Sequence, residues 1–199
     1  MKLLIVTQAV DADDPVLGFF CRWIEEFAKH AERVEVICLK EGKHNLPANV
    51  RVHSLGKPRF AKATQGMGAR AKYVFNFYTY IWQLRRDYDT VFVHMNPEYI
   101  IAAGLLWRLI GKRVALWYTH KSVDTKLRIA TFLSNIIFTA SKESFRLRSR
   151  KVRVMGHGID TDFFSPDTSI ARGDWMLSVG RLTPSKRHDL AIRKAVQES

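Results

Sequence analysis

Short apolar runs alternate along the chain with longer segments in which apolar residues recur at helical spacing. The first run, residues 2–7, predicts a buried strand, and a polar loop follows it at residues 8–15. In residues 16–30 the apolar positions are 16, 19, 20, 23, 24 and 27, which is the spacing of an amphipathic helix. The chain therefore opens with a strand, a loop and a helix.

The same alternation continues to about residue 155. Further strands are predicted at residues 34–39, 50–55, 90–95, 113–120, 135–141 and 151–155, and further helices at residues 69–86, 97–110, 127–134 and 142–149. About seven strands that alternate with helices predict an α/β fold with a doubly wound, mostly parallel Rossmann-like sheet. A strand at 175–179 and a helix at 190–196 follow this sheet.

Composition places the protein among globular chains and in a reducing compartment. Apolar residues make up 47% of the sequence, which is ample for a core. No apolar run approaches the roughly 20 residues of a spanning helix, and the N-terminal run is too short for the core of a signal peptide. Cys21 and Cys38 lack CxxC spacing and lie in a predicted helix and a predicted strand, so we expect them in the core. We expect a cytoplasmic protein.

Positive charge is concentrated after residue 56. The chain carries a formal net charge of +13, whereas residues 1–56 hold 7 basic and 8 acidic side chains. Residues 57–86 contain seven Lys or Arg and no acid, interleaved with aromatic residues. Such a segment suits an anionic membrane surface or a nucleic acid. The cations are spread over several loops without a nucleic-acid reader motif, so we expect peripheral binding to the cytoplasmic face of a membrane.

Two cations five positions apart follow the apolar run 175–179. Arg181 and Lys186 lie in a turn that starts at Gly180 and leads into the predicted helix 190–196. A helix N-terminus offers free N–H groups, so a diphosphate would find donors and charge together there. Taken alone, two cations at this spacing are more often solvated loop residues.

The surrounding residues favour the diphosphate interpretation. The stretch GHGIDTDFFSP at 156–166, followed by LSVGRLTPSKR at 177–187, resembles the interdomain crossing of glycosyltransferase family 4. This family has the GT-B architecture of two facing Rossmann-like domains. The resemblance implies a retaining transferase that moves a sugar from a nucleotide-sugar donor to a lipid-linked or cell-envelope glycan. Arg181 and Lys186 match the pair that holds the donor diphosphate, and the resemblance implies no cofactor and no obligate metal.

Two further site residues follow from the resemblance. Family members often carry a glycine pair that faces the donor at the start of the first helix, and here Gly18 alone remains, after Leu17. Both a donor-binding and a packing role stay open for Gly18. His120, at the end of the predicted strand 113–120, matches a family histidine that faces the donor's sugar and phosphate, which implies a catalytic role. A capping or loop histidine is the alternative.

Histidines could also suggest a metal site at the ends of the predicted strands. His94, His120 and His157 all lie at such ends. No carboxylate or cysteine completes the set, and none of the three has metal-ligand spacing along the chain. We therefore expect no metal.

The resemblance divides the chain into two parts. Residues 1–167 correspond to an N-terminal, acceptor-side Rossmann-like domain, and residues 168–199 to a linker and the first strand and helix of an incomplete donor-binding domain. One strand and one helix cannot bury a core, so we expect a missing C-terminal domain to act in cis or in trans. The family's paired glutamates of that domain are absent, so we expect little or no transferase activity from this chain alone. The alternative is a non-catalytic acceptor-binding subunit, or basic binding module, of a split transferase.

Overall fold

The computed structural model describes residues 1–58, 66–159, 161–162, 164–170, 173, 177–180 and 183–198. They divide into two compact units, Met1–His157 and Gly158–Ser199, and each is described by itself. The first unit contains a seven-stranded sheet. Its strands are β1 (Lys2–Val10), β2 (Arg33–Glu41), β3 (Val50–Ser54), β4 (Thr90–His94), β5 (Arg113–Trp117), β6 (Ile136–Thr139) and β7 (Val152–Val154). Its α-helices are α1 (Phe20–His30), α2 (Met67–Gln83), α3 (Pro97–Leu109) and α4 (Thr125–Leu133).

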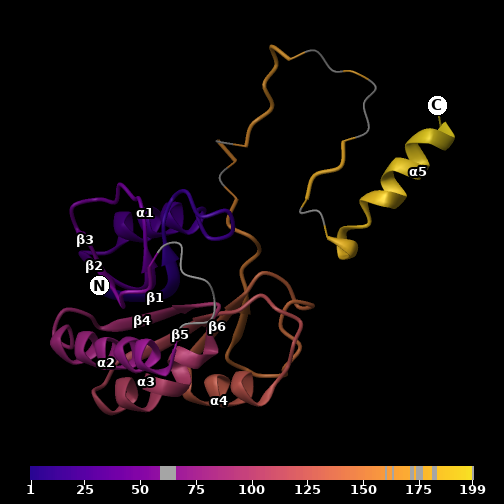
Figure 1. Cartoon of the computed structure of the whole chain (residues 1–199). Coiled ribbons are helices and arrows are strands. Elements are labelled where there is room, and N and C mark those ends of the chain that lie inside the picture. Colours follow the sequence, from indigo (N-terminus) through magenta and orange to yellow (C-terminus); the bar gives the residue numbers. More distant parts are fainter. Residues whose placement is uncertain are drawn as a thin grey trace. The chain divides into compact units, whose positions relative to one another are not determined.

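All strand pairs in the sheet are parallel, and the strand order is β3-β2-β1-β4-β5-β6-β7. Leu4 of β1 is paired with Glu35 of β2 on one side and with Val91 of β4 on the other, so β1 lies inside the sheet. The doubly wound parallel sheet expected from the sequence is confirmed (Figure 1). Because all strands run in one direction, their carboxyl ends meet at a single edge.

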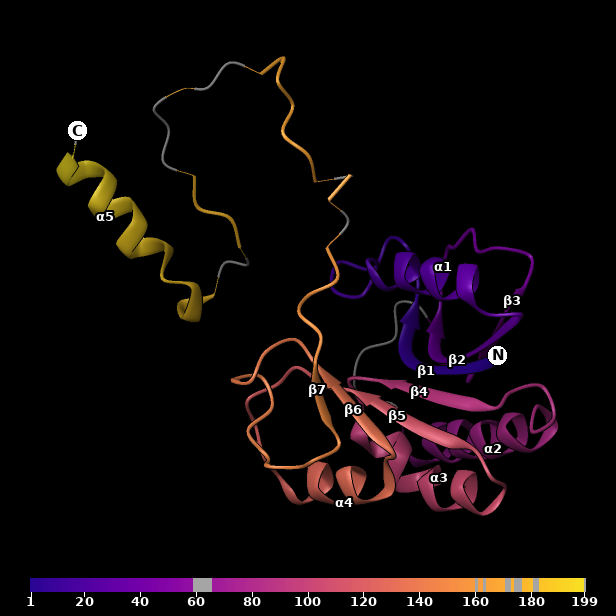
Figure 2. The same ribbon diagram turned by 180° about the vertical axis from the view of Figure 1, so that it is seen from behind.

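Helices cover both faces of this sheet. α2, α3 and α4 lie together on one face, and α1 lies on the other (Figures 1 and 2). β1 contributes to both cores, because Leu4 packs with the core under α2–α4 whereas Ile5 packs with the core under α1. A strand that is buried on both faces reads as a continuous apolar run, which is why the pattern identified β1.

The first helix starts later than its apolar spacing predicts. The Asp14 carboxylate accepts hydrogen bonds from the backbone N–H groups of Val16 and Leu17, at 3.0 and 2.9 Å, and holds them in a turn. α1 begins only at Phe20. Val16 and Phe19 are exposed, so two of the positions that made residues 16–19 look helical are not buried.

The prediction of a helix over residues 142–149 is wrong. These residues connect β6 to β7 without an α-helix. Phe145 is buried against the Tyr118 ring and Leu147 packs on the same core, whereas Arg146 is exposed. Burial at every second residue is the pattern of extended backbone, since residues two apart lie on different sides of a helix.

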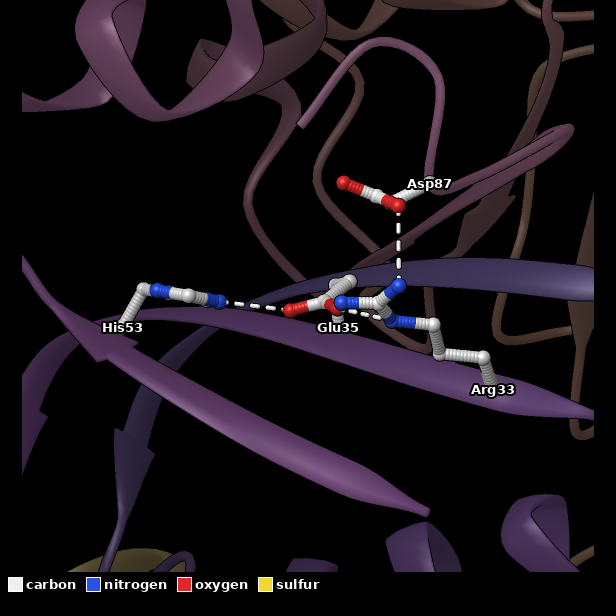
Figure 3. Close-up of polar contacts among 4 residues, drawn as sticks. All are labelled: Arg33, Glu35, His53 and Asp87. Atoms are coloured by element: carbon white, nitrogen blue, oxygen red, sulfur yellow. Dashed lines mark hydrogen bonds and ion pairs between the residues drawn. The ribbon is translucent and has the colours of Figure 1, made fainter. Parts of the chain in front are cut away.

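A buried carboxylate links three segments of the first unit (Figure 3). Glu35 on β2 accepts a hydrogen bond from Arg33 Nε at 2.5 Å, and its other oxygen lies 2.6 Å from His53 Nε2 on β3. Arg33 also donates to Asp87, in the segment before β4, at 2.8 Å. The Glu35 side chain is fully buried, while those of Arg33 and His53 are 29% and 22% exposed. The network therefore joins β2, β3 and the entry to β4 around one shielded charge.

The second unit contains a 3₁₀ turn, η1 (Pro184–Lys186), and the helix α5 (His188–Glu198). α5 confirms the helix expected at residues 190–196. Two residues of the strand expected at 175–179, Trp175 and Met176, lie outside the described residues, and residues 177–179 form no strand. The domain boundary expected after residue 167 stays a prediction.

Candidate functional site at the carboxyl edge of the sheet

Polar side chains gather where the three central strands end. Gln8 lies near the end of β1, Asn96 follows β4, and His120 lies three residues after β5. β4 pairs with both β1 and β5, so these ends are neighbours. Ligands of open parallel sheets bind outside this edge, and we call it the carboxyl edge.

One hydrogen bond joins the ends of β1 and β4. The Gln8 side-chain amide donates to Asn96 Oδ1 at 2.9 Å, and the Asn96 side-chain amide donates to the His94 carbonyl at 3.0 Å. Asn96 immediately precedes α3, so its side chain fixes the turn between β4 and α3 to the neighbouring strand. The sequence analysis gave Gln8 no role at this edge.

Between His94 and Asn96 the backbone takes a strained conformation. Met95 has φ = 63°, in the left-handed region that a residue with a side chain rarely adopts. Its N–H donates to the Trp117 carbonyl at 2.8 Å, and its Sδ accepts a hydrogen bond from Thr119 Oγ1 at 3.3 Å. Both contacts come from β5 or its extension and hold Met95 in place. Conformations of this kind concentrate at ligand sites.

His94 is part of the core. Its ring stacks on Phe20 of α1, with centroids 4.0 Å apart and planes inclined by 15°, and its Nδ1 lies 3.3 Å from Thr7 Oγ1. Burial lowers the pKa of His94 to about 4, so the imidazole is neutral at neutral pH. His94 is therefore a buried residue that packs between the end of β4 and α1.

His120 is exposed beyond the end of β5. Its Nδ1 accepts a hydrogen bond from the Ser122 backbone N–H at 3.1 Å, and its ring lies edge-on to Tyr118 at 6.3 Å. A neutral imidazole that accepts at Nδ1 carries its proton on Nε2. His120 can therefore donate a hydrogen bond from Nε2 while its backbone turn fixes the ring. Its catalytic role stays a prediction.

Gly18 lies against the backbone of the loop between β1 and α1. Its N–H donates to the Asp14 carbonyl at 2.9 Å. A Cβ at this position would lie 2.7 Å from the carbonyl oxygens of both Ala12 and Asp14, closer than real Cβ atoms come. The geometry thus requires glycine for packing, and the donor-binding role stays a prediction.

Replacing Gly18 with alanine is expected to lower the free energy of unfolding by about 1–2 kcal/mol, because the loop must shift to admit the methyl group. Urea denaturation measures this loss. Gly68→Ala is the matched control, since nothing lies within 4 Å of a Cβ there, and helix propensity should make it neutral or stabilising. A Gly18→Ala protein of unchanged stability with weakened UDP-glucose binding would favour the donor role instead.

Carboxylates fix the loop that contains Gly18. Asp11 is buried, and its Oδ1 accepts from the backbone N–H groups of Asp13 and Lys43, both at 3.2 Å. The Lys40 ammonium lies 2.5 Å from Asp14, and its hydrogen bond lowers the pKa of Asp14 to about 2. Asp11 and Asp14 therefore anchor the loop to β2 and to the segment after it.

The residues expected to bind the diphosphate belong to the second unit. Arg181 lies outside the described residues. Lys186 ends η1, is exposed, and precedes the start of α5 by two residues. Next to it, Arg187 forms an ion pair with Asp189 at 3.0 Å. The diphosphate-binding role of Arg181 and Lys186 stays a prediction.

Within the part of the chain that the structure describes, no three His, Cys, Asp or Glu side chains are grouped as metal ligands. In the same residues, none of the helices has both the length and the apolar character needed to cross a bilayer.

Several solved structures share the fold of this chain. HepE of Anabaena in complex with UDP matches with a TM-score of 0.58 and 15% identity over 85% of this chain and 47% of HepE. The apo form of the lipopolysaccharide outer core galactosyltransferase WaaB matches with a TM-score of 0.51 and 13% identity, over 80% of this chain and 46% of WaaB. MurG of Acinetobacter baumannii matches with a TM-score of 0.50 and 12% identity, over 77% of this chain and 45% of MurG. The chain thus spans about half the length of these proteins, and the likeness shows the fold.

Comparison of sequences identifies the family. No curated protein sequence matches the chain significantly. A family model described as "Glycosyl transferase 4-like" matches residues 10–149, which covers most of the first unit and includes Asn96 and His120. The chain belongs to the glycosyl transferase 4-like family.

Proposed function

We propose that this chain is the acceptor-side part of a retaining glycosyltransferase that moves a hexose from a nucleoside-diphosphate sugar to a lipid-linked or cell-envelope glycan. The observation that carries the proposal is His120, held at the carboxyl edge of the family's sheet with its Nε2 available as a donor. HepE, which has a similar fold, was solved with UDP and with UDP-glucose, and this supports a nucleotide-sugar donor.

In this proposal the protein supplies positioning and charge stabilisation. His120 donates from Nε2 to a sugar hydroxyl or to the leaving phosphate. Arg181 and Lys186 neutralise the departing diphosphate without an obligate metal, while the acceptor hydroxyl attacks from the same face of the sugar. The β4–α3 turn, which Gln8 and Asn96 hold in place, forms the adjacent wall on which the acceptor lies.

The proposal also requires a donor-binding domain, in cis or in trans, because the paired glutamates that hold the nucleoside and sugar in the family are absent from this sequence. We therefore expect little or no transfer by the 199-residue chain alone. Addition of a donor-binding domain should restore transfer. Rapid turnover by the chain alone would contradict the need for a second domain.

Titration of UDP-glucose and GDP-mannose into the chain tests the site, with backbone amide NMR shifts as the readout. Weak binding is expected, with shifts at residues 8, 95–96 and 119–122 and at residues 183–188. His120→Ala should weaken binding at least about tenfold, because a hydrogen bond to a charged phosphate is worth about 1.5–3 kcal/mol.

The control for this experiment is His30→Ala. His30 is an exposed histidine at the last residue of α1, far along the chain from the carboxyl edge. Its replacement should leave nucleotide-sugar binding unchanged. Shifts that avoid the carboxyl edge, or equal binding by the His120→Ala and His30→Ala proteins, would contradict the proposal.

A further inference from the structure

A chain of hydrogen bonds at the carboxyl edge fixes which way the Gln8 side-chain amide points. The backbone carbonyl of His94 can only accept, so the Asn96 side chain presents its NH2 group there, with Nδ2 3.0 Å from the carbonyl oxygen. Asn96 Oδ1 therefore points toward Gln8, whose own NH2 group donates to it at 2.9 Å. The orientation of a side-chain amide is decided by such a network. The Gln8 carbonyl oxygen, Oε1, is thus the end of the amide that Asn96 does not contact.

The turn between β4 and α3 builds this chain of hydrogen bonds without a ligand. Met95 takes its left-handed conformation, with φ = 63°, between His94 and Asn96, and the Asn96 side chain returns to the carbonyl two residues before it. The Trp117 carbonyl accepts from the Met95 N–H at 2.8 Å, and the Thr119 hydroxyl donates to Met95 Sδ at 3.3 Å. The two amides therefore belong to an arrangement that is formed in advance, as ligand sites usually are.

Gln8 Oε1 is the acceptor that this arrangement leaves open. Within the described ranges of the chain, no protein donor forms a hydrogen bond to this oxygen, and the Gln8 side chain is half-buried. The backbone on both sides of Gln8 is fixed in the sheet, because Thr7 and Ala9 are buried and pair with residues of β2. A carbonyl oxygen that is fixed, half-buried and without a protein donor is suited to accept from a bound molecule.

The chemistry around Gln8 Oε1 favours a neutral hydroxyl as its partner. An amide oxygen can only accept, so it repels the oxygens of phosphates and carboxylates. The other members of the chain of hydrogen bonds carry no charge, because Asn96 is an amide and the buried His94 imidazole is neutral. Glu98, in the first turn of α3, forms an ion pair with Lys126 at 2.9 Å. A diphosphate is therefore disfavoured at this position, whereas a sugar hydroxyl fits it.

We propose that Gln8 determines acceptor specificity: its Oε1 accepts a hydrogen bond from a hydroxyl group of a neutral sugar ring, and Asn96 is the positioning residue that keeps this oxygen turned toward the ligand. The inference rests on the proposed function, because it names what the wall beside the β4–α3 turn recognises in the acceptor. A sugar that lacks this hydroxyl leaves Gln8 Oε1 without its donor and binds more weakly.

Titration of sugars into the chain tests the inference, with backbone and side-chain amide NMR shifts as the readout. The probes are the methyl glycosides of glucose, galactose and mannose and, for the one that binds most tightly, its monodeoxy analogues. This parent glycoside should shift the side-chain amide signals of Gln8 and Asn96. One monodeoxy analogue should bind about fivefold more weakly than the parent, which corresponds to about 1 kcal/mol, the usual net contribution of a neutral hydrogen bond.

Gln8→Met identifies the partner of that hydroxyl, because methionine has a similar volume but no amide. In this variant the parent glycoside should bind about fivefold more weakly, and removal of the same hydroxyl from the sugar should have no further effect. Gln83→Met is the matched control, since Gln83 is an exposed glutamine at the last residue of α2. Its replacement should leave the affinities for the parent and the analogue unchanged. Circular dichroism should confirm that both variants are folded.

Two substitutions at Asn96 separate positioning from a merely structural role. Asn96→Asp keeps an oxygen that accepts from the Gln8 amide, and a carboxylate is favourable just before a helix, so glycoside affinity should stay within about twofold. Asn96→Leu removes that oxygen and lets the Gln8 amide rotate, so affinity should fall about threefold. Both substitutions break the hydrogen bond to the His94 carbonyl. A loss of equal size in the two variants would overturn the positioning role of Asn96.

Three results would overturn the role of Gln8. They are the absence of shifts at Gln8 and Asn96 with every glycoside, equal binding of the parent by the Gln8→Met and Gln83→Met proteins, and a Gln8→Met protein that still distinguishes the parent from the analogue. The titration contains no nucleotide. Binding of UDP-glucose at the carboxyl edge without binding of any glycoside would overturn this inference alone, and the reverse result would overturn only the nucleotide-sugar donor of the proposed function.

Discussion

Replacing Glu35 with alanine is expected to lower the free energy of unfolding by about 3 kcal/mol. The change leaves Arg33 and His53 without the carboxylate that both contact, and Arg33 keeps only Asp87. Removal of one partner from a buried ion pair costs about 3–5 kcal/mol. The lower end applies here, because water reaches Arg33 and His53, whose side chains are partly exposed.

Urea denaturation followed by circular dichroism measures this loss. Glu32→Ala is the control, since Glu32 is an exposed glutamate three residues away, and its removal should change stability by less than about 0.5 kcal/mol. Asp87→Asn should have an intermediate effect, because its partner Arg33 keeps Glu35. Glu35→Ala and Glu32→Ala proteins of equal stability would show that the network contributes nothing.

Acidification from pH 7 to pH 4.5 is expected to remove about 2–3 kcal/mol of stability through His94 alone. The pKa of His94 is about 4 in the folded protein, against 6.5 when exposed. Between these values the unfolded chain binds a proton that the folded protein does not, so stability falls as pH falls, by about 1.4 kcal/mol per pH unit. The ring contacts of His94 are with Phe19, Phe20 and Trp23, none of which can stabilise an imidazolium by charge.

The comparison of His94→Gln with the unaltered chain isolates this effect. The loss of unfolding free energy between pH 7 and pH 4.5 should be about 2–3 kcal/mol smaller in the variant than in the unaltered chain. This difference does not depend on the stability of the variant at pH 7. Asp14, whose pKa is lowered to about 2, contributes stability that is lost only as pH falls below 3.8, outside this window. An identical pH dependence in both proteins would mean that His94 is not buried in solution.

The architecture could be predicted from the sequence because the central strands are short apolar runs and the helices are longer segments with apolar residues at helical spacing. The errors lie where local pattern and tertiary contact disagree. Residues 145–150 alternate apolar or small side chains with arginine, which indicates extended backbone, whereas the sequence analysis predicted a helix over residues 142–149. At residues 16–19 the apolar spacing was helical, but the Asp14 carboxylate holds these residues in a turn.

The site could be predicted only in part. His120 was expected as the last residue of a strand over 113–120, whereas β5 ends at Trp117 and His120 lies three residues beyond it. The burial of His94 could not be predicted, because it requires Phe20 of α1 to fold over the end of β4. The bond between Gln8 and Asn96 joins residues 88 positions apart, and no local pattern contains such a pairing. A polar residue within an otherwise apolar strand, such as Gln8, was the available signal.

The central position of β1 determines the order in which the chain can fold. During synthesis β1, β2 and β3 emerge first and can pair in sequence, but the other side of β1 remains open until β4 has been made. The side chains on both faces of β1 are mostly apolar, and the strand that pairs with this edge, β4, begins at Thr90. Late closure between distant segments slows folding and leaves a strand edge free for intermolecular association. The nascent protein is therefore most prone to aggregation before residue 94 has left the ribosome.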